Sequence, residues 1–475
     1  MKLHSDAARC RRLTPSLAGC LAALVLALSG CQAPPVRDKG NLPSARLPAQ
    51  FSVQMPDVEP GTAEAVSAAP WWQRFGSREL DALVVRALES NSDLKIASLR
   101  ISQAKIRAAQ TRAGELPTLT APLRAVAQSP SASSNAQQSS QVALQAIWRP
   151  DVWGEQRGLA ESAELQVARA VHERENMQRL VIGTIVNLYI GYLASSDAID
   201  MAQKNEAVIQ EILVNIEKRA SLGDATASEL EQQRAALGVQ QALMPGLVNQ
   251  RDELRINLAR MLGVLPAEMD LTDRGVETLR VPALKMTLPS ELLLNRPDIR
   301  MMEDRMRAAN ADINVARARL MPSVDLSVQA GLGGVSLLQL FSPQNLLVNA
   351  TAAIAATIFD GGRREGNKAY AESYYEEMVE TYAQTVYQAV REVESALSSL
   401  RAGQLQREAQ DRTTRAALNM FKIASDAYEL GSVDLTVLLD ARKNYQRNLE
   451  DAMHGRERML KAYAALFNAL ADSAN

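Results

Sequence analysis

The sequence predicts an α+β membrane protein in which short paired strands alternate with very long helices, arranged in two similar halves. Three observations predict this fold class. Proline, which breaks helix interiors, is absent from 151–244 and from 344–475. Four runs of about ten residues alternate apolar and polar side chains, as half-exposed strands do. The two halves of the chain also share residues at a nearly constant spacing.

Composition limits the class of protein. The 475 residues carry 52 Lys and Arg against 54 Asp and Glu, so the net charge is −2. This balance gives no basic surface for nucleic-acid binding. The only long apolar run lies in the first 30 residues, and a polytopic helical membrane protein is therefore excluded.

The N-terminus has the features of a secretion signal. Three arginines precede an apolar run over 17–28, and Leu-Ser-Gly then leads to Cys31. A cysteine in this position resembles the bacterial lipobox, in which the thiol is acylated and becomes the first mature residue. We therefore expect a signal peptide over 1–30 and a covalent lipid (palmitate) on Cys31, with no other cofactor. Because Gln32 follows rather than Asp, the resemblance favours the outer membrane; ordinary signal cleavage beside a chance cysteine is the alternative.

Cleavage would also remove the other two cysteines. The mature chain would then keep one thiol, so neither a disulfide nor a Cys-ligated metal site is expected. The following segment, 31–70, is rich in proline and is expected to be an extended, lipid-anchored tether.

The rest of the chain is predicted to hold two structural repeats, 71–265 and 266–475. Residues of the same type recur at two constant intervals. At 205 residues the pairs are Asp93 with Asp298, Arg100 with Arg305, Ala104 with Ala309 and Pro117 with Pro322. At 208 residues they are Gly154 with Gly362, Leu222-Gly223 with Leu430-Gly431, Leu230 with Leu438 and Arg234 with Arg442.

Each repeat is expected to contain a helix, a β-hairpin and a long helical hairpin. The β-hairpins are predicted at 118–149 and 323–359, and the helical hairpins at 155–262 and 361–471. The clearest helical stripe runs from Val379 to Leu400, where apolar residues are three and four positions apart. A single helix over 155–219 would be roughly 100 Å long. A set of shorter helices is the alternative.

The strand runs have the length of tilted membrane strands, with one face toward lipid and the other toward a lumen. Taken alone, they also fit half-buried strands of a water-soluble protein, but the lipobox favours the membrane. Strands in lipid cannot leave their edges unpaired, and four strands are too few to close a barrel. We therefore expect several copies to share one barrel; three copies would give twelve strands, continued by a tube of long helices.

Several motifs resemble one family. They are Trp71-Trp72 with Phe75, Asn91-Ser92-Asp93-Leu94, Asn295-Arg296-Pro297-Asp298-Ile299, Leu320-Met321-Pro322, Asp360-Gly361-Gly362-Arg363 and 428–440 with Ala441-Arg442. Their order, together with the lipobox, resembles the TolC-like outer-membrane efflux proteins, and in particular the lipoprotein (NodT-type) branch that serves resistance-nodulation-division (RND) pumps. The resemblance covers essentially the whole mature chain.

The resemblance implies a function as well as an architecture. The family is trimeric, with a twelve-stranded barrel above a twelve-helix periplasmic tunnel. This chain is accordingly expected to be a passive exit duct for small molecules expelled by an inner-membrane RND pump, reached through a periplasmic adaptor (membrane fusion) protein. The expected partners are two further copies of the chain, the adaptor, the pump and outer-membrane lipid, without nucleic acid.

The resemblance also implies roles for the two helical turns. Leu222-Gly223 and Leu430-Gly431 would form the tip that docks the adaptor. Tyr428 would act as a gate and Asp440 as an acidic constriction, with Asp434 and Asp224 as further candidates for cation selectivity. The alternative is that these acids are solvated turn residues or N-caps.

Catalysis has little support in the sequence. His172-Glu173 begins like a zinc HExxH motif, but Asn176 stands where the second histidine is needed. The chain is therefore expected not to be an enzyme and not to hold a metal. The alternatives to an RND-linked duct are a duct for type I secretion, a coiled-coil lipoprotein without a pore, and a lipid-anchored hydrolase, for which a catalytic cluster is missing. The cargo cannot be identified from the sequence.

Overall fold

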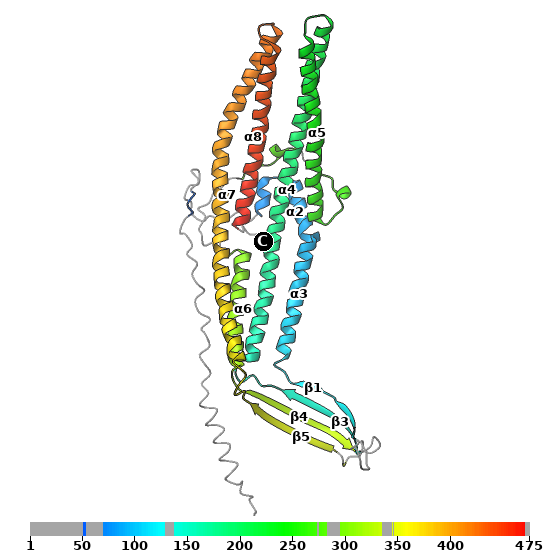
Figure 1. Ribbon diagram of the computed structural model, residues 1–475, viewed down its shortest axis with the longest axis vertical. Helices are drawn as coiled ribbons and strands as arrows, with labels where there is room; N and C mark the ends of the chain where they lie inside the picture. The colour runs from blue at the N-terminus through cyan, green and yellow to red at the C-terminus, as the bar shows by residue number, and fades with distance from the viewer. Residues whose placement is uncertain are drawn as a thin grey trace, which may run out of the picture. The chain divides into compact units, whose positions relative to one another are not determined.

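The computed structural model describes residues 51–53, 70–128, 137–272, 275–282, 295–334, 344 and 346–470 (Figure 1). The signal peptide, Cys31 and most of the predicted tether and strand-connecting loops lie outside these ranges. The first elements are η1 (Trp71–Phe75), α2 (Arg78–Ser90), α3 (Ser92–Ala113), β1 (Thr118–Thr120), β2 (Leu123–Gln128), β3 (Gln137–Trp148), α4 (Glu155–Ser221) and α5 (Ala227–Leu262). They are followed by η2 (Pro266–Glu268), η3 (Val276–Thr278), α6 (Pro297–Ala318), β4 (Ser323–Gly334), β5 (Leu346–Ala355), α7 (Arg363–Glu429) and α8 (Leu435–Ala469).

The described residues form two compact units, a strand unit and a helical unit. The strand unit takes 111–161 and 310–373, and the helical unit takes 51–110, 162–309 and 374–470. Each unit therefore combines segments from both halves of the sequence.

The strand unit contains one antiparallel sheet in the order β1-β3-β4-β5, with β2 also paired to β3 (Figure 1). Alternate residues of a strand lie on opposite faces. The register places Leu144 opposite Ala330 and Ala330 opposite Val348 on one face. On the other face Gln145 pairs with Gln329, which pairs with Asn349. One face is thus apolar and the other carries a row of amides, in agreement with the alternation in the sequence.

The first strand differs from the prediction. The sequence predicts one continuous run through 118–125, but the structure has two short strands, β1 and β2, on either side of Ala121-Pro122. Proline has no N–H to donate to a strand ladder. The Pro122 carbonyl still accepts a hydrogen bond from the Ala143 N–H at 3.2 Å, so β1 and β2 follow the same partner strand.

The junctions between strands and helices are held by side-chain hydrogen bonds to the backbone. Arg364 pairs with Asp360 at 2.9 Å and donates to the Arg319 carbonyl at 2.9 Å. Gly361 and Gly362 have φ values of 66° and 84°, a conformation that favours glycine. The motif 360–362 therefore has a structural role as the return from strand to helix.

The helical unit is organised by two antiparallel pairs of long helices, α4 with α5 and α7 with α8 (Figure 1). α4 and α7 are each a single helix of 67 residues, so the alternative of several shorter helices is wrong. α4 is also long and apolar enough to cross a membrane. Its apolar stretch is instead covered by protein, because Val181, Ile185 and Tyr189 are each at most 2% exposed.

The main core of this unit forms where α4, α7 and α8 meet the shorter helices. The predicted α7 stripe is confirmed: Tyr382, Val386, Val393, Leu397 and Leu400 are buried, while Val379 and Val390 pack against the core. Trp71 of η1 stacks on Phe467 of α8 with ring centroids 5.9 Å apart. A second, smaller tip cluster, separate from the main core, contains Ile216, Ala424, Leu435, Leu438 and Ala441.

Candidate functional site

The two turns at the free ends of the helical pairs have the same local structure. Gly223 and Gly431 adopt φ values of 84° and 68°, the left-handed conformation that ends many helices. The N–H of the following residue donates back across the turn, from Asp224 to the Arg219 carbonyl and from Ser432 to the Ala427 carbonyl, both at 2.9 Å.

Each turn leaves a leucine in solvent. Leu222 is 71% exposed and Leu430 is 84% exposed. An apolar side chain at this position contributes nothing to the packing of its own chain, and burying it against a partner would be favourable. The geometry is therefore suited to adaptor docking, which stays a prediction.

The helices that follow the two turns begin differently. Thr226 and Glu229 form a capping box at the start of α5: the Thr226 N–H donates to the Glu229 carboxylate at 2.7 Å and the Glu229 N–H to the Thr226 hydroxyl at 3.2 Å. Asp434 is the N-cap residue of α8, but its side chain makes no capping hydrogen bond. Asp434 therefore occupies the N-cap position, as the alternative interpretation expects, but its side chain does not cap the helix. The residue is exposed to solvent.

Arg219 links the two turns. Its guanidinium donates to the Tyr428 hydroxyl at 2.5 Å and to the Asp224 carbonyl at 3.2 Å, and it lies 5.7 Å from the centre of the Tyr428 ring. The structure therefore gives the predicted gate residue Tyr428 a partner that sequence reasoning missed. The signal available was a basic residue in the last turn of a helix, which ordinarily indicates only an interaction with the helix dipole.

The predicted acids do not converge within one chain. Asp224 engages Arg219 through its backbone carbonyl, and the side chains of Asp434 and Asp440 are exposed. No group of three or more His, Cys, Asp and Glu side chains suited to a metal ion occurs among the residues the structure describes. An acidic constriction would therefore need further copies of the chain, and it stays a prediction.

A polar layer separates the tip cluster from the main core; it consists of Asn205, Gln233, Gln240 and Arg442. Gln233 and Gln240 of α5 donate to the α4 carbonyls of Ile209 and Ala202, at 3.0 and 3.1 Å. Arg442 of α8 donates to the Asn205 carbonyl at 2.7 Å and to its side-chain oxygen at 2.5 Å. The Asn205 amide in turn donates to Gln240 at 2.8 Å. Three helices are thus joined through one asparagine.

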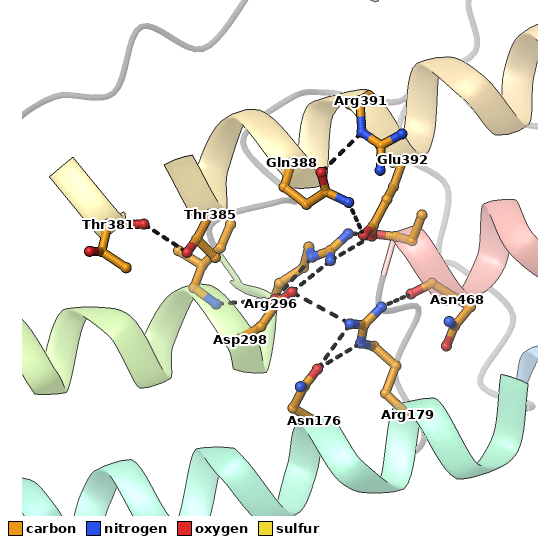
Figure 2. Close-up of polar contacts among 12 residues, drawn as sticks. Asn176, Arg179, Arg296, Asp298, Thr381, Thr385, Gln388, Arg391, Glu392 and Asn468 are labelled. Atoms are coloured by element: carbon orange, nitrogen blue, oxygen red, sulfur yellow. Dashed lines mark hydrogen bonds and ion pairs between the residues drawn. The ribbon is translucent and has the colours of Figure 1, made fainter. Parts of the chain in front are cut away.

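A second polar network, of opposite character, lies in the main core and is centred on Arg296 (Figure 2). Arg296 is 1% exposed and pairs with Asp298 at 2.7 Å and with Glu392 of α7 at 2.8 Å. It also donates to the Ala469 carbonyl at the end of α8, at 2.7 Å. Arg179 of α4 reaches Asp298 at 3.4 Å. Two guanidinium groups and two carboxylates therefore balance in charge while they join α4, α6, α7 and α8.

The charges of this network shift the pKa values of its members. Burial alone would raise the pKa of Asp298, but the hydrogen bond and charge of Arg296, with the charge of Arg179, hold that pKa below its ordinary value. Burial also lowers the pKa of Arg179, and the neighbouring Arg296 lowers it further. Asp298 is thus kept ionised as one member of a compensated cluster.

The hydrogen bond from Arg296 to the Ala469 carbonyl has a counterpart in the first half of the chain, where an uncharged residue 205 positions earlier is the donor. Asn91 donates to the Met261 carbonyl near the end of α5 at 2.8 Å, as Arg296 does to Ala469 near the end of α8. These acceptors are 208 residues apart, which is the second interval found in the sequence. The residue before each short helix therefore holds the end of a long one.

Comparisons with known proteins agree with this architecture. A family described as outer membrane efflux protein matches residues 83–264 and 288–472. The pyoverdine export outer membrane protein OpmQ of Pseudomonas putida KT2440 is 30% identical over 463 residues, which are 95% of this chain and 96% of that protein.

Solved structures show the same fold. Crystal structures of CusC superpose with a TM-score of 0.83 at 22% identity, over 92% of this chain and 99% of that one. The open state of the MtrE outer membrane channel of Neisseria gonorrhoeae gives a TM-score of 0.81 at 24% identity, over 92% and 97% of the two chains. The family match covers most of the sequence, and the predicted resemblance is confirmed: the chain belongs to the outer membrane efflux protein family.

Proposed function

We propose that this chain is one subunit of a trimeric, passive exit duct that crosses the outer membrane and extends into the periplasm. Its family places it among efflux channels and not among enzymes. The observation that carries the trimeric part is the incomplete sheet, because a single chain cannot shield it from lipid.

The sheet is incomplete in two respects. Its outermost strands in the order β1-β3-β4-β5 have one unpaired edge each within the described chain. Its apolar face is also exposed, with Leu123 at 69% and Val348 at 64%. Unpaired backbone groups cost several kcal/mol each in hydrocarbon. With β1 and β2 counted as one interrupted strand, three copies would supply twelve strands, a number found in closed barrels.

The amide row then has a natural place. Gln145, Gln329 and Asn349 lie on the face opposite the apolar side chains, so a closed barrel would turn them toward the lumen. Amides hydrogen-bond to water and carry no charge, so this part of the duct would select little by charge. Selection by charge is proposed instead for the acids Asp434 and Asp440 of the helical unit.

The remaining assignments follow from the lipobox and the family. We propose that a lipid on Cys31 anchors the chain and that Leu222 and Leu430 dock a periplasmic adaptor, which connects the duct to an inner-membrane RND pump. Two relatives are named for pyoverdine export and for cation efflux, so membership of the family does not assign one cargo.

A tip mutation tests the gate. We expect Arg219→Ala and Tyr428→Phe each to raise the open probability of the purified protein in planar bilayers several-fold. Each change removes a hydrogen bond to a charged group at an exposed site, and such a bond contributes about 1 kcal/mol after screening by solvent. Single-channel conductance is the measurement.

Lys218→Ala is the matched control, because Lys218 is the exposed cation next to Arg219 in the same helical turn. It should leave conductance unchanged. A protein that forms no ion path in any of these variants, or that is a water-soluble monomer, would be a coiled-coil lipoprotein without a pore.

A further inference from the structure

Arg442 is a buried cation without a counter-ion. It is 8% exposed, and its hydrogen bonds go to one residue, through the backbone carbonyl and the side-chain oxygen of Asn205. Both acceptors are neutral. Within the described part of the chain, no carboxylate lies within ion-pair distance of Arg442, whereas Arg296, the other buried arginine, has two.

Burial lowers the pKa of Arg442, which shows that its surroundings disfavour the charge. Guanidinium groups nevertheless stay protonated at neutral pH. The charge is therefore present and its loss of hydration is not compensated by an ion pair. Such an arrangement is destabilising, because the desolvation of a charge is repaid only when partners of opposite charge replace the water.

The neighbouring members of the polar layer are also imperfectly matched. Gln233 is fully buried, and its side-chain oxygen has no hydrogen-bond partner although its amide is bound. Asn205 is shared between Gln240 and Arg442. Along α4 and α8, this layer lies between two apolar clusters that do favour close packing.

The repeat provides a comparison. Arg234 stands 208 residues before Arg442, on α5, the helix that follows the first turn. Its side chain is 50% exposed and pairs with Glu217 at 3.2 Å and with Glu231 at 2.9 Å. The same residue type is thus hydrated and paired in one half, and buried without a carboxylate in the other.

We propose that Arg442 opposes the closed packing of α8 against α4 and so keeps the tip close to its opening transition. This proposal rests on the duct function given above, and it takes the packed arrangement of α4 and α8 in this structure as the closed state. Separation of the two helices exposes more of the guanidinium to water, which recovers hydration lost in the closed state. The tip cluster and the Arg219–Tyr428 hydrogen bond act in the opposite direction, so the closed state is only slightly favoured.

The test uses the two partners of one hydrogen bond, for which opposite effects are expected. Methionine is flexible and of similar length, so Arg442→Met fills the site without a charge. It should raise the melting temperature by on the order of 5 °C and lower the open probability by about tenfold. Asn205→Ala leaves the cation buried with fewer acceptors; it should lower the melting temperature and raise the open probability.

Arg234→Met is the matched control, and it should change neither quantity, because surface ion pairs contribute little. The opposite result for Arg442→Met, a lower melting temperature with more frequent opening, would show that Arg442 holds the helices together or is neutralised by a second copy of the chain. That result overturns the proposal.

The two readouts separate this proposal from the duct function. If the protein never conducts and Arg442→Met has a higher melting temperature, the destabilising role of Arg442 would be supported and the duct function would be contradicted. Conduction combined with a lower melting temperature would support the duct and contradict the role of Arg442.

Discussion

Replacing Arg296 by methionine is expected to lower the free energy of unfolding of the helical unit by about 3–5 kcal/mol. Arg296 is almost fully buried and joins Asp298, Glu392 and the end of α8 (Figure 2). Methionine fills similar space but removes the cation from Glu392 and the donor from the Ala469 carbonyl, and it leaves Asp298 with the longer contact to Arg179. Removal of one partner from a buried cluster is costly because the remaining charges lose their compensation.

Chemical denaturation followed by circular dichroism measures this change. Arg300→Met is the control, since Arg300 is exposed on α6, the helix that begins directly after Arg296, and among the described residues its side chain hydrogen-bonds to Asn295 alone; its effect should stay within about 0.5 kcal/mol. Equal stabilities of the two variants would show that the network contributes no more than a surface contact.

The stability that is lost in Arg296→Met should depend on pH in a defined direction. The folded-state pKa of Asp298 is lowered from 3.8, so its ionised form stabilises the native state above that pH. This contribution disappears as the pH falls through the lowered folded-state pKa. The difference between the wild type and Arg296→Met should therefore be largest near neutral pH and should shrink below about pH 4. A difference that grows toward acid would contradict the assignment.

Replacing Gly331 by alanine is expected to prevent most of the protein from reaching its folded membrane form. Gly331 of β4 pairs with Ala143 of β3. A Cβ atom at this position would overlap the Val142 carbonyl oxygen and would lie 2.7 Å from the Ala143 Cα. These are backbone atoms of the neighbouring strand and cannot rotate away, so the strands must separate. Overpacking costs about 1–3 kcal/mol per site, and the proposed barrel contains the site three times.

Gly333→Ala is a closely matched control on the same strand and the same face. There, among the described residues, a Cβ would meet only the end of the Leu347 side chain, at 3.3 Å, which can move. The amount of heat-modifiable oligomer in outer-membrane fractions is the measurement. Normal amounts of Gly331→Ala oligomer would show that β3 and β4 are not paired in this register in the membrane.

Much of the fold could be predicted from the sequence because it depends on local chemistry. The absence of proline from long stretches permits α4 and α7, and the α7 stripe from Val379 to Leu400 marks the face that is buried. Period-two alternation identifies the strands and their two faces. The interruption at Pro122 cannot be predicted from the alternation, because the alternation continues through it, and only the ladder shows which donor is lost.

The candidate site could be predicted less completely from the sequence than the fold. Gly223 and Gly431 were found because a left-handed helix end needs glycine. Tyr428 was indicated by family resemblance, but its partner Arg219 lies 209 residues away in the sequence, and no local pattern connects them. The motif around Arg296 was recognised as a family feature without any indication that it joins four helices.

The sequence by itself determined the lengths of the helices, the two faces of the strands and the positions of the turns, since each follows from the backbone preferences and spacing of nearby residues. Only the tertiary structure decided whether an individual charged side chain is buried or exposed to solvent. Arg234 and Arg442 occupy corresponding positions in the two halves, yet one is paired in solvent and the other is buried. Burial depends on which third helix covers a given face, and that is a property of the assembled helices rather than of any one segment.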